Sequence, residues 1–261
     1  MNEHRRVVIT GLGAVTPIGN DVESMWAALL AGQSGAGPIT RFDTTEFSTK
    51  IACEVTDFDG RELLGKKEAR RYDRFAQFGV VAALEAMTHS GLDGPPPGVT
   101  PDRFGVIFGS GIGGISTMEA QHDIIRERGP SRVSPFFIPM FIPDIAAGLI
   151  SIRFGARGPN YATVSACASS SHAIGDAFRF IERGDADIMI AGGAEATLTP
   201  LAVAGFASMK ALSTRNQDPK GASRPFDAGR DGFVIGEGAG CLVIEALETA
   251  TARGATIVAE L

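Results

Sequence analysis

Residues Thr163 to Gly175 read TVSACASSSHAIG, and the chain is organised around this stretch. An apolar β-type run, Tyr161 to Val164, leads into it, and a helix rich in small residues, from about Ala168 to Arg183, leads out. We therefore expect Cys167 at a strand-to-helix junction. The first N–H groups of a helix have no internal partners and carry partial positive charge, so a thiolate placed there is stabilised and becomes a usable nucleophile. The N–H of Cys167 could also stabilise an oxyanion on a thioester carbon under attack.

The same stretch also has a purely structural interpretation. Free cysteine is among the most buried residue types, and small residues suit a helix that packs closely against its neighbours. His172 lies five positions after Cys167, which turns it away on a helix, so we expect it to pack in the core rather than act as a base. The other histidines, His4, His89 and His122, have no catalytic context. The local pattern thus predicts a nucleophile without a partner.

Composition limits the classes of protein to consider. With 261 residues and 44% hydrophobic content, the chain can form one large domain or two small ones. The net charge of −6 does not indicate nucleic-acid binding. Three widely spaced cysteines argue against a disulfide framework, and no pair has metal-ligand spacing. No apolar run is long enough to cross a bilayer and the first residues lead directly into a strand, so we expect a cytoplasmic protein without a signal peptide or membrane insertion.

Apolar runs and helical periods alternate along the chain, which predicts an α/β fold with a central mixed sheet. We expect strands at residues 5–10, 51–55, 104–108, 161–164, 187–191 and 255–261. A Gly cluster suggests that residues 231–240 pair with 241–245 as a hairpin. We expect helices at residues 22–31, 66–90, 115–128, 168–183 and 200–212.

Two connecting segments have distinctive composition. Gly11 to Asn20 is predicted to be a loop. Ser134 to Pro143 cannot form a regular helix, because each proline removes a backbone donor. Its large apolar side chains indicate a loop that something covers, such as a second subunit.

The turn Gly109 to Gly114 matches the G-x-G-x-x-G pattern of dinucleotide sites and follows an expected strand. A lone match is weak, and the next helix leads into Gly129-Pro130 instead of a second strand that ends in an acidic residue. We favour a tight turn with close backbone packing over a nucleotide site. The alternative, ligand-binding interpretation is that Ile112 lines a pocket.

Basic residues recur at helical spacing in the expected helix at 66–90. They are Lys67, Arg70, Arg71 and Arg74. The pattern is typical of a solvated helix face. It also fits a docking patch for an acidic partner, and the sequence leaves both interpretations open.

A set of motifs follows the whole chain in order. They are Val7-Val8-Ile9-Thr10-Gly11-Leu12-Gly13, Gly109 to Gly114, Ser134-Pro135-Phe136-Phe137, Ser165-Ala166-Cys167, Gly184 to Glu195, Ala211 to Asn216, Ser223 to Asp227, and Arg230 to Gly240. With these motifs the chain resembles the N-terminal half of a type II 3-oxoacyl-[acyl-carrier-protein] synthase. This family of β-ketoacyl synthases comprises acyltransferases of fatty acid biosynthesis in the thiolase superfamily.

The resemblance implies a thiolase-like fold, with a mixed sheet and helices on both faces. It implies that residues 1–253 form the first of two similar halves, that residues 254–261 start the second, and that the rest of the second half is missing. In the family that half carries two catalytic histidines, a catalytic lysine and a second oxyanion donor. We therefore expect this chain alone to be inactive and to expose apolar surface. No cofactor or metal is implied.

The resemblance also assigns roles to residues. Cys167 would take the acyl group from an acyl carrier protein, and malonyl carrier protein would then lose carbon dioxide and attack the acyl-Cys167 thioester to give a longer 3-oxoacyl product. Ile112 and Phe206 would bound the acyl tunnel, with Phe137 contributed across a homodimer interface. The residues that would face the acidic carrier protein are Lys67, Arg70, Arg71, Arg132 and Lys210. The alternative is a non-catalytic partner subunit, although such subunits lack the cysteine.

Overall fold

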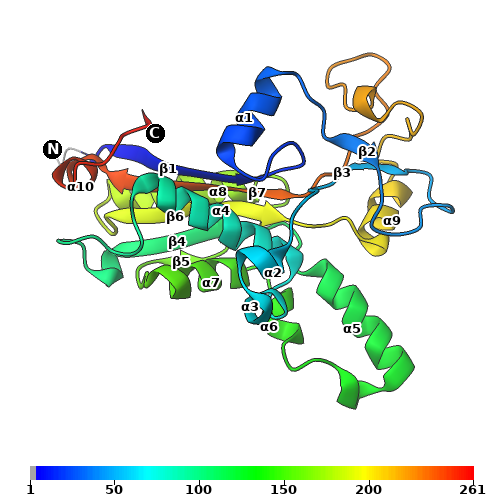
Figure 1. The fold of residues 1–261 in the computed structure, drawn as a ribbon, viewed down its shortest axis with the longest axis horizontal. Coiled ribbons are helices and arrows are strands. Elements are labelled where there is room, and N and C mark those ends of the chain that lie inside the picture. The colour runs from blue at the N-terminus through cyan, green and yellow to red at the C-terminus, as the bar shows by residue number, and fades with distance from the viewer. Residues whose placement is uncertain (1–3) are drawn as a thin grey trace.

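The computed structural model describes residues 4–261, and a six-stranded mixed sheet forms its centre (Figure 1). The strand order is β5-β4-β6-β7-β1-β8. Strand β4 is parallel to β5 and β6, whereas β7 is antiparallel to both β6 and β1. The strands are β1 (Val7–Val15), β4 (Phe104–Gly109), β5 (Asn160–Tyr161), β6 (Ile188–Glu195), β7 (Gly238–Ala246) and β8 (Ala259–Glu260). The predicted α/β class with a mixed sheet is confirmed.

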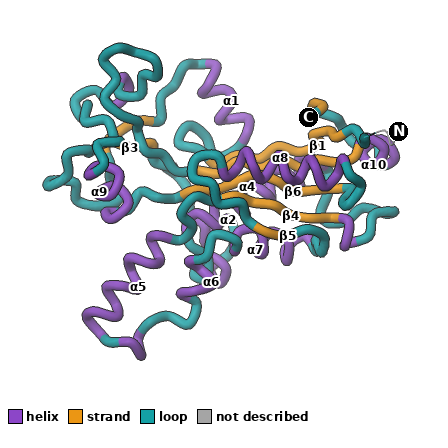
Figure 2. The backbone as a smooth tube through the Cα atoms, turned by 180° about the vertical axis from the view of Figure 1, so that it is seen from behind, coloured by secondary structure: helices purple, strands orange, loops and turns teal. Residues whose placement is uncertain are grey.

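Helices cover both faces of this sheet. Helices α4 (Arg74–Ser90) and α7 (Ile145–Phe154) pack on one face, and α8 (Ser169–Glu182) packs on the other (Figure 2). The apolar side chains of a strand divide between the two cores, because successive side chains point to opposite faces of the sheet. In β4, Val106 and Phe108 join the core under α4 and α7, whereas Ile107 joins the core under α8.

A smaller unit lies at one end of the sheet. It contains the two-stranded pair β2 (Ala36–Pro38) and β3 (Ile51–Cys53) together with α9 (Pro200–Ser208). Buried apolar residues hold this unit together, among them Ile39, Val203 and Ile235. The remaining helices are α1 (Val22–Leu30), α2 (Gly60–Leu63), α3 (Lys66–Ala69), α5 (Ile115–Arg128), α6 (Phe137–Phe141) and α10 (Leu247–Ala252). None of the helices within residues 4–261 combines the length and apolarity needed to span a bilayer.

Strand β1 is longer than predicted. Residues 11–15 were expected to lie in a loop, but β1 continues to Val15 and pairs with β7 along this part. A Cβ atom at Gly11 or Gly13 would collide with the backbone carbonyls of Ala86 and Ala82 in α4. The two glycines thus allow α4 to approach β1 closely. They were expected to form a loop, but their role is in packing.

The predicted hairpin at residues 231–245 is wrong. A single strand, β7, runs from Gly238 and pairs with β1 on one side and β6 on the other. Residues 231–237 form no regular strand and make only isolated bridges, Leu212 with Phe233 and Cys53 with Gly236. Two of the glycines here allow close backbone packing, since a Cβ at Gly232 would lie 2.4 Å from the carbonyl carbon of Leu212 and a Cβ at Gly238 would lie 2.5 Å from the carbonyl oxygen of Val15.

The predicted helix at 66–90 is two helices, α3 and α4, separated at residues 70–73. The Asp73 side chain caps α4 by accepting the N–H of Phe75 at 3.3 Å. It also accepts the N–H of Thr117 at 3.0 Å, at the start of α5. The four basic residues therefore do not share one helix face, and the guanidinium of Arg74 bonds to Glu237 instead.

Three further predictions need correction. Residues 134–143 were expected to exclude a regular helix, yet they contain the short helix α6. Pro139 is tolerated there because the first N–H groups of a helix have no internal partners. The helix predicted at 200–212 ends earlier, at Ser208, and the strand predicted at 161–164 is reduced to β5. Strand β8 pairs with β1, so residues 259–260 extend the same sheet.

Candidate active site

Cys167 lies two residues before the first residue of α8, at the junction predicted from the sequence. The preceding residue, Ala166, has a φ of +51°, in the left-handed region that side chains other than glycine rarely adopt. Such a conformation costs about 1–2 kcal/mol. The bend at Cys167 is therefore held by the contacts around it.

Ser169 makes most of those contacts. Its hydroxyl accepts the N–H of Ser165 at 2.9 Å and donates to the carbonyl of Ala166 at 2.7 Å. Its own carbonyl accepts the hydroxyl of Thr163 at 2.7 Å. Because Ser169 is only 3% exposed, water does not compete for these bonds. We refer to residues 163–169 as the cysteine elbow.

His172 lies on the solvent side of α8, so the prediction that it packs in the core is wrong. Its Nδ1 atom contacts the hydroxyl of Ser165 at 2.6 Å. The residue sits one helical turn beyond the elbow, on a face that α8 turns away from the sheet. It does not line the cavity beside Cys167.

A cavity of about 610 Å³ opens beside Cys167. Its lining brings together three residues that the sequence singled out, namely Cys167, Ile112 and Phe206. Most of the remaining lining comes from the ends of β4 and β6 and from residues 233–240. Neither a histidine nor a lysine of residues 4–261 lines it. The cavity therefore offers a thiol and mostly apolar walls, and the only lining side chains of the usual general-base types within residues 4–261 are the carboxyls of Glu195 and Glu237, of which Glu237 pairs with Arg74.

The three cysteines differ in accessibility. Cys241 is buried in β7, and burial strongly raises the pKa of its thiol. Burial also raises the pKa of Cys53, which is partly buried. Cys167 is exposed and lies at the cavity. Of the three thiols, it alone combines access to solvent with a helix start.

The turn at residues 109–114 packs directly against the cysteine elbow. A Cβ at Gly109 would lie 2.6 Å from the carbonyl carbon of Ser169, so only glycine fits without a shift. The carboxylate of Glu195 accepts the N–H of Gly111 at 2.6 Å and, more weakly, the N–H of Ile112 at 3.4 Å. A nucleotide phosphate would need those donors, and the chain's own carboxylate holds them. The turn is a packing device, as the sequence analysis favoured.

Glu195 is a site residue that the sequence analysis missed. Its pKa is raised by burial, although the N–H groups of Gly111 and Ile112 and the hydroxyl of Ser110 oppose that effect. The strand was predicted to end at residue 191, whereas β6 continues to Glu195. Its bonds to a turn 84 positions away could not be read from the sequence either.

Phe233 is a second residue that the sequence analysis did not assign. Its ring meets the ring of Phe206 edge to face, with centroids 5.5 Å apart, and both line the cavity. Backbone bonds fix it, since its N–H donates to the carbonyl of Ala211 and its carbonyl accepts the N–H of Ser213, both at 2.9 Å. The two rings form one wall of the cavity.

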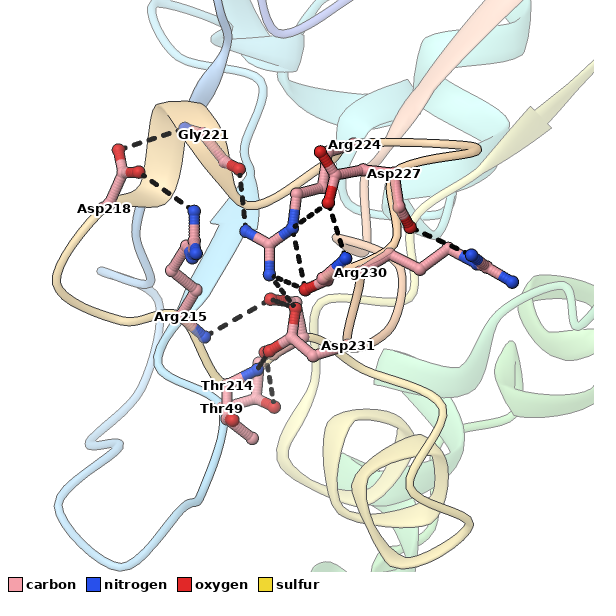
Figure 3. Close-up of polar contacts among 11 residues, drawn as sticks. Thr49, Thr214, Arg215, Asp218, Gly221, Arg224, Asp227, Arg230 and Asp231 are labelled. Carbon is pink, nitrogen blue, oxygen red and sulfur yellow. Dashed lines mark hydrogen bonds and ion pairs between the residues drawn. The ribbon is translucent and has the colours of Figure 1, made fainter.

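The loop around that wall is held by a polar network (Figure 3). Asp231 accepts the hydroxyl of Ser213 at 2.8 Å, the N–H of Thr214 at 3.0 Å and a guanidinium N–H of Arg224 at 3.2 Å. These donors, the Ser213 hydroxyl foremost, lower the pKa of Asp231. Thr49 adds a bond to the carbonyl of Ser213 at 3.1 Å. The network ties the loop to the segment that carries Phe233.

The basic residues assigned to carrier docking are all exposed: Lys67, Arg70, Arg71, Arg132 and Lys210. The guanidinium of Arg71 lies 4.7 Å over the ring of Phe136, which brings α3 close to the segment that follows Arg132. Lys210 follows α9, which Figures 1 and 2 show apart from α2 and α6. Their docking role stays a prediction.

Phe137 lies in α6, where its ring is 5.8 Å from that of Phe141. It does not line the cavity. Its neighbours Phe136 and Ile138 are exposed by 40% and 58%. The part of the chain that the structure describes contains no group of three or more metal-ligating side chains placed to hold a metal ion.

Comparison with known proteins agrees with this geometry. The family "Beta-ketoacyl synthase, N-terminal domain" matches residues 4–250. The chain is 54% identical, over all 261 residues, to 3-oxoacyl-[acyl-carrier-protein] synthase 2 of Staphylococcus aureus (strain COL). It is 52% identical over 259 residues to the protein of that name from Synechocystis. In both cases it spans 62% of the relative's length.

Solved structures show the same fold. A β-ketoacyl synthase from Burkholderia phymatum superposes with a TM-score of 0.87 at 37% identity, over 98% of this chain and 62% of that one. A type II polyketide ketosynthase, described in complex with its acyl carrier protein and bound to a hexaketide, superposes with a TM-score of 0.86 at 32% identity, over 99% of this chain and 62% of that one.

Proposed function

Because the chain belongs to the β-ketoacyl synthase family, we propose that it is the nucleophile-bearing part of a condensing enzyme of fatty-acid or polyketide synthesis. One observation carries the proposal. Cys167 is exposed at a cavity of about 610 Å³, on a strained elbow that ends at the start of α8. This arrangement places a thiol at the start of a helix and beside space for an acyl chain.

The first step that we propose is acyl transfer. The sulfur of Cys167 attacks the carbonyl carbon of an acyl thioester carried by an acyl carrier protein. A new C–S bond forms, the bond to the carrier's sulfur breaks, and the carrier thiol leaves with a proton. The N–H of Cys167 donates to the oxyanion, because it stands at the start of a helix. The acyl chain enters the cavity between Ile112 and the pair Phe206 and Phe233.

The second step is condensation with malonyl carrier protein. The malonyl group loses carbon dioxide, and the resulting carbanion attacks the acyl-Cys167 carbonyl. A C–C bond forms, the C–S bond to Cys167 breaks, and the 3-oxoacyl product stays on the carrier while the Cys167 thiolate takes a proton from water. Decarboxylation needs a donor for the malonyl thioester oxygen, and the cavity lining within residues 4–261 includes neither histidine nor lysine. We therefore propose that the 261-residue chain alone accepts an acyl group but does not condense.

Carrier docking is proposed at the five exposed basic residues, Lys67, Arg70, Arg71, Arg132 and Lys210. Acyl carrier proteins are acidic, and complementary charge speeds encounter and fixes orientation. A solved relative is described in complex with its carrier, which supports the same kind of partner here. The exposed side chains beside Phe137, namely Phe136 and Ile138, support a homodimer contact at α6.

Alkylation of the folded chain with iodoacetamide, followed by mass mapping, tests the proposal. We expect Cys167 to react about tenfold faster than the same cysteine in the urea-unfolded chain, as its proposed role as a nucleophile requires. Incubation with an acyl carrier protein thioester should add one acyl group to the wild type and none to Cys167→Ser. Alkylation no faster than in the unfolded chain, together with no acyl adduct, would support the non-catalytic alternative.

A further inference from the structure

The carboxyl of Glu195 has no role in the two steps above, although it lies in the same cavity as Cys167. We propose that Glu195 is a specificity-determining residue: it anchors the turn at 109–114 and thereby sets how far Ile112 reaches into the cavity, which limits the length of alkyl chain that can lie beside Cys167. This inference rests on the proposed function, because it concerns the acyl chain that Cys167 would carry.

The anchor is made of bonds to successive residues of the turn. One carboxylate oxygen accepts the N–H of Gly111 at 2.6 Å. The other accepts the hydroxyl of Ser110 at 3.3 Å and the N–H of Ile112 at 3.4 Å. That hydroxyl oxygen in turn accepts the N–H of Gly113 at 3.0 Å. The backbone on both sides of Ile112 is therefore attached, directly or through Ser110, to one side chain.

The turn also packs against the cysteine elbow. A Cβ at Gly111 would lie 2.7 Å from a carboxylate oxygen of Glu195 and 3.5 Å from the carbonyl oxygen of Ala166. Glu195 and the cysteine elbow thus both lie against the turn. Beyond Ile112, the N–H of Gly114 donates to the carbonyl of Phe141 at 3.0 Å. Ile112 is held at both ends, and only the Glu195 end faces the cavity.

A stability role alone does not explain a carboxylate here. Within residues 4–261, the donors to Glu195 are neutral N–H and hydroxyl groups, and no cation lies within ion-pair distance. The fully buried glutamates, Glu237 and Glu245, each pair with an arginine, whereas the partly buried Glu85, like Glu195, accepts neutral N–H groups. A partly buried carboxylate without a counter-charge carries a desolvation cost, and its bonds offset that cost only by positioning the turn.

The occupant of this space is an unbranched alkyl chain attached to a thioester. The walls beside Ile112 are aromatic or aliphatic, with Phe206 and Phe233 opposite the glycine-rich strand ends. If the anchor is removed, the turn gains freedom and Ile112 can retreat. Longer alkyl chains should then fit beside Cys167, whereas the reaction rate of a small reagent such as iodoacetamide should change little.

The test uses the 261-residue chain and a graded set of N-alkyl iodoacetamides, from iodoacetamide itself to N-dodecyl iodoacetamide. The rate at Cys167 is measured by mass mapping, and each variant's long-chain rate is divided by its own iodoacetamide rate. We expect this ratio to rise about fivefold or more in Glu195→Ala and about threefold in Glu195→Gln, which keeps an oxygen for Gly111. Gly111→Ala, whose Cβ would push against the same carboxylate, should shift the ratio in the same direction.

The outcomes are distinguishable from those of the proposed function. A slow iodoacetamide reaction in the wild type would count against a reactive Cys167, whatever the ratio does. A ratio that stays within about twofold of wild type in both Glu195→Gln and Gly111→Ala overturns the role of Glu195, whatever the absolute rates. These two variants decide the matter if Glu195→Ala fails to fold.

Discussion

Replacing Ser169 by alanine should loosen the cysteine elbow. The substitution removes one acceptor and one donor, because the hydroxyl bonds the N–H of Ser165 at 2.9 Å and the carbonyl of Ala166 at 2.7 Å. Ser169 is only 3% exposed, so water does not readily replace it. We expect two effects: a loss of folding stability and a slower reaction of Cys167.

The magnitude follows from these bonds. Each is worth about 1 kcal/mol net, and a donor left unpaired in a buried place costs about as much again. The left-handed conformation of Ala166 stores about 1–2 kcal/mol, part of which is released when the elbow relaxes. The balance is a loss of about 2 kcal/mol in the free energy of unfolding. For a chain of this size, that lowers the melting temperature by about 4–8 °C.

Thermal unfolding and the iodoacetamide rate at Cys167 measure the two effects. Ser171→Ala is the matched control, because Ser171 is an exposed serine in the same helical turn and should change stability by about 0.5 kcal/mol or less. A merely structural role would lower the melting temperature and leave the rate at Cys167 in the folded chain as it is. A melting temperature of Ser169→Ala within about 1 °C of wild type would refute the reasoning.

Two further substitutions test the supports of the fold. Glu237→Ala leaves the guanidinium of Arg74 without its partners at 2.8 and 3.0 Å, and should cost about 2–4 kcal/mol in urea unfolding; a loss below about 1 kcal/mol would contradict this. Asp187 has its pKa lowered by bonds to Arg103 first and Arg5 second, so its contribution is present above the ordinary carboxyl pKa and disappears as the pH falls through the lowered value. The difference in unfolding free energy between wild type and Asp187→Asn should therefore shrink as the pH falls below the ordinary carboxyl pKa. A difference that does not depend on pH would show that the ion pair does not act this way.

The elements that could be predicted well are those with signals at both ends. The helix predicted at 115–128 is found as Ile115–Arg128, because Gly114 and Gly129 bound a periodic segment on each side. Strand β4 extends one residue beyond its predicted end. The residues at the two ends of such a segment indicate where it begins and ends, so the local sequence is sufficient to predict its bounds.

Glycine-rich segments could not be predicted, because a glycine serves a turn and a close backbone approach equally well. At Gly11 and Gly13 the reason for glycine is a pair of carbonyls in α4, which no local pattern contains. The hairpin expected at 231–245 failed for the same reason. The glycine of β7 at 240 faces β6, not a neighbouring strand made from 231–237.

Some residues of the candidate site could likewise be predicted from the sequence, and others could not. The junction at Cys167 followed from residue types on its two sides, whereas Ile112 and Phe206 were assigned through the family resemblance. Glu195 and Phe233 escaped both routes, because their significance depends on the partner each meets. Those partners, the turn at 109–114 and the ring of Phe206, lie in separate parts of the chain.

The topology of the sheet explains why these separate parts meet. Strands β4 and β6 are parallel, so their last residues, Gly109 and Glu195, lie at the same edge and the turn that follows β4 reaches the carboxyl. Strand β7 is antiparallel to β6, so it begins at that edge, with Gly238 opposite Glu195. A ligand site outside the carboxyl ends of parallel strands is the general expectation for α/β sheets. Because side chains alternate along a strand, a one-residue slip of β6 against β7 would turn Glu195 away from the turn, so the register of these two strands must be kept for the cavity to keep its shape.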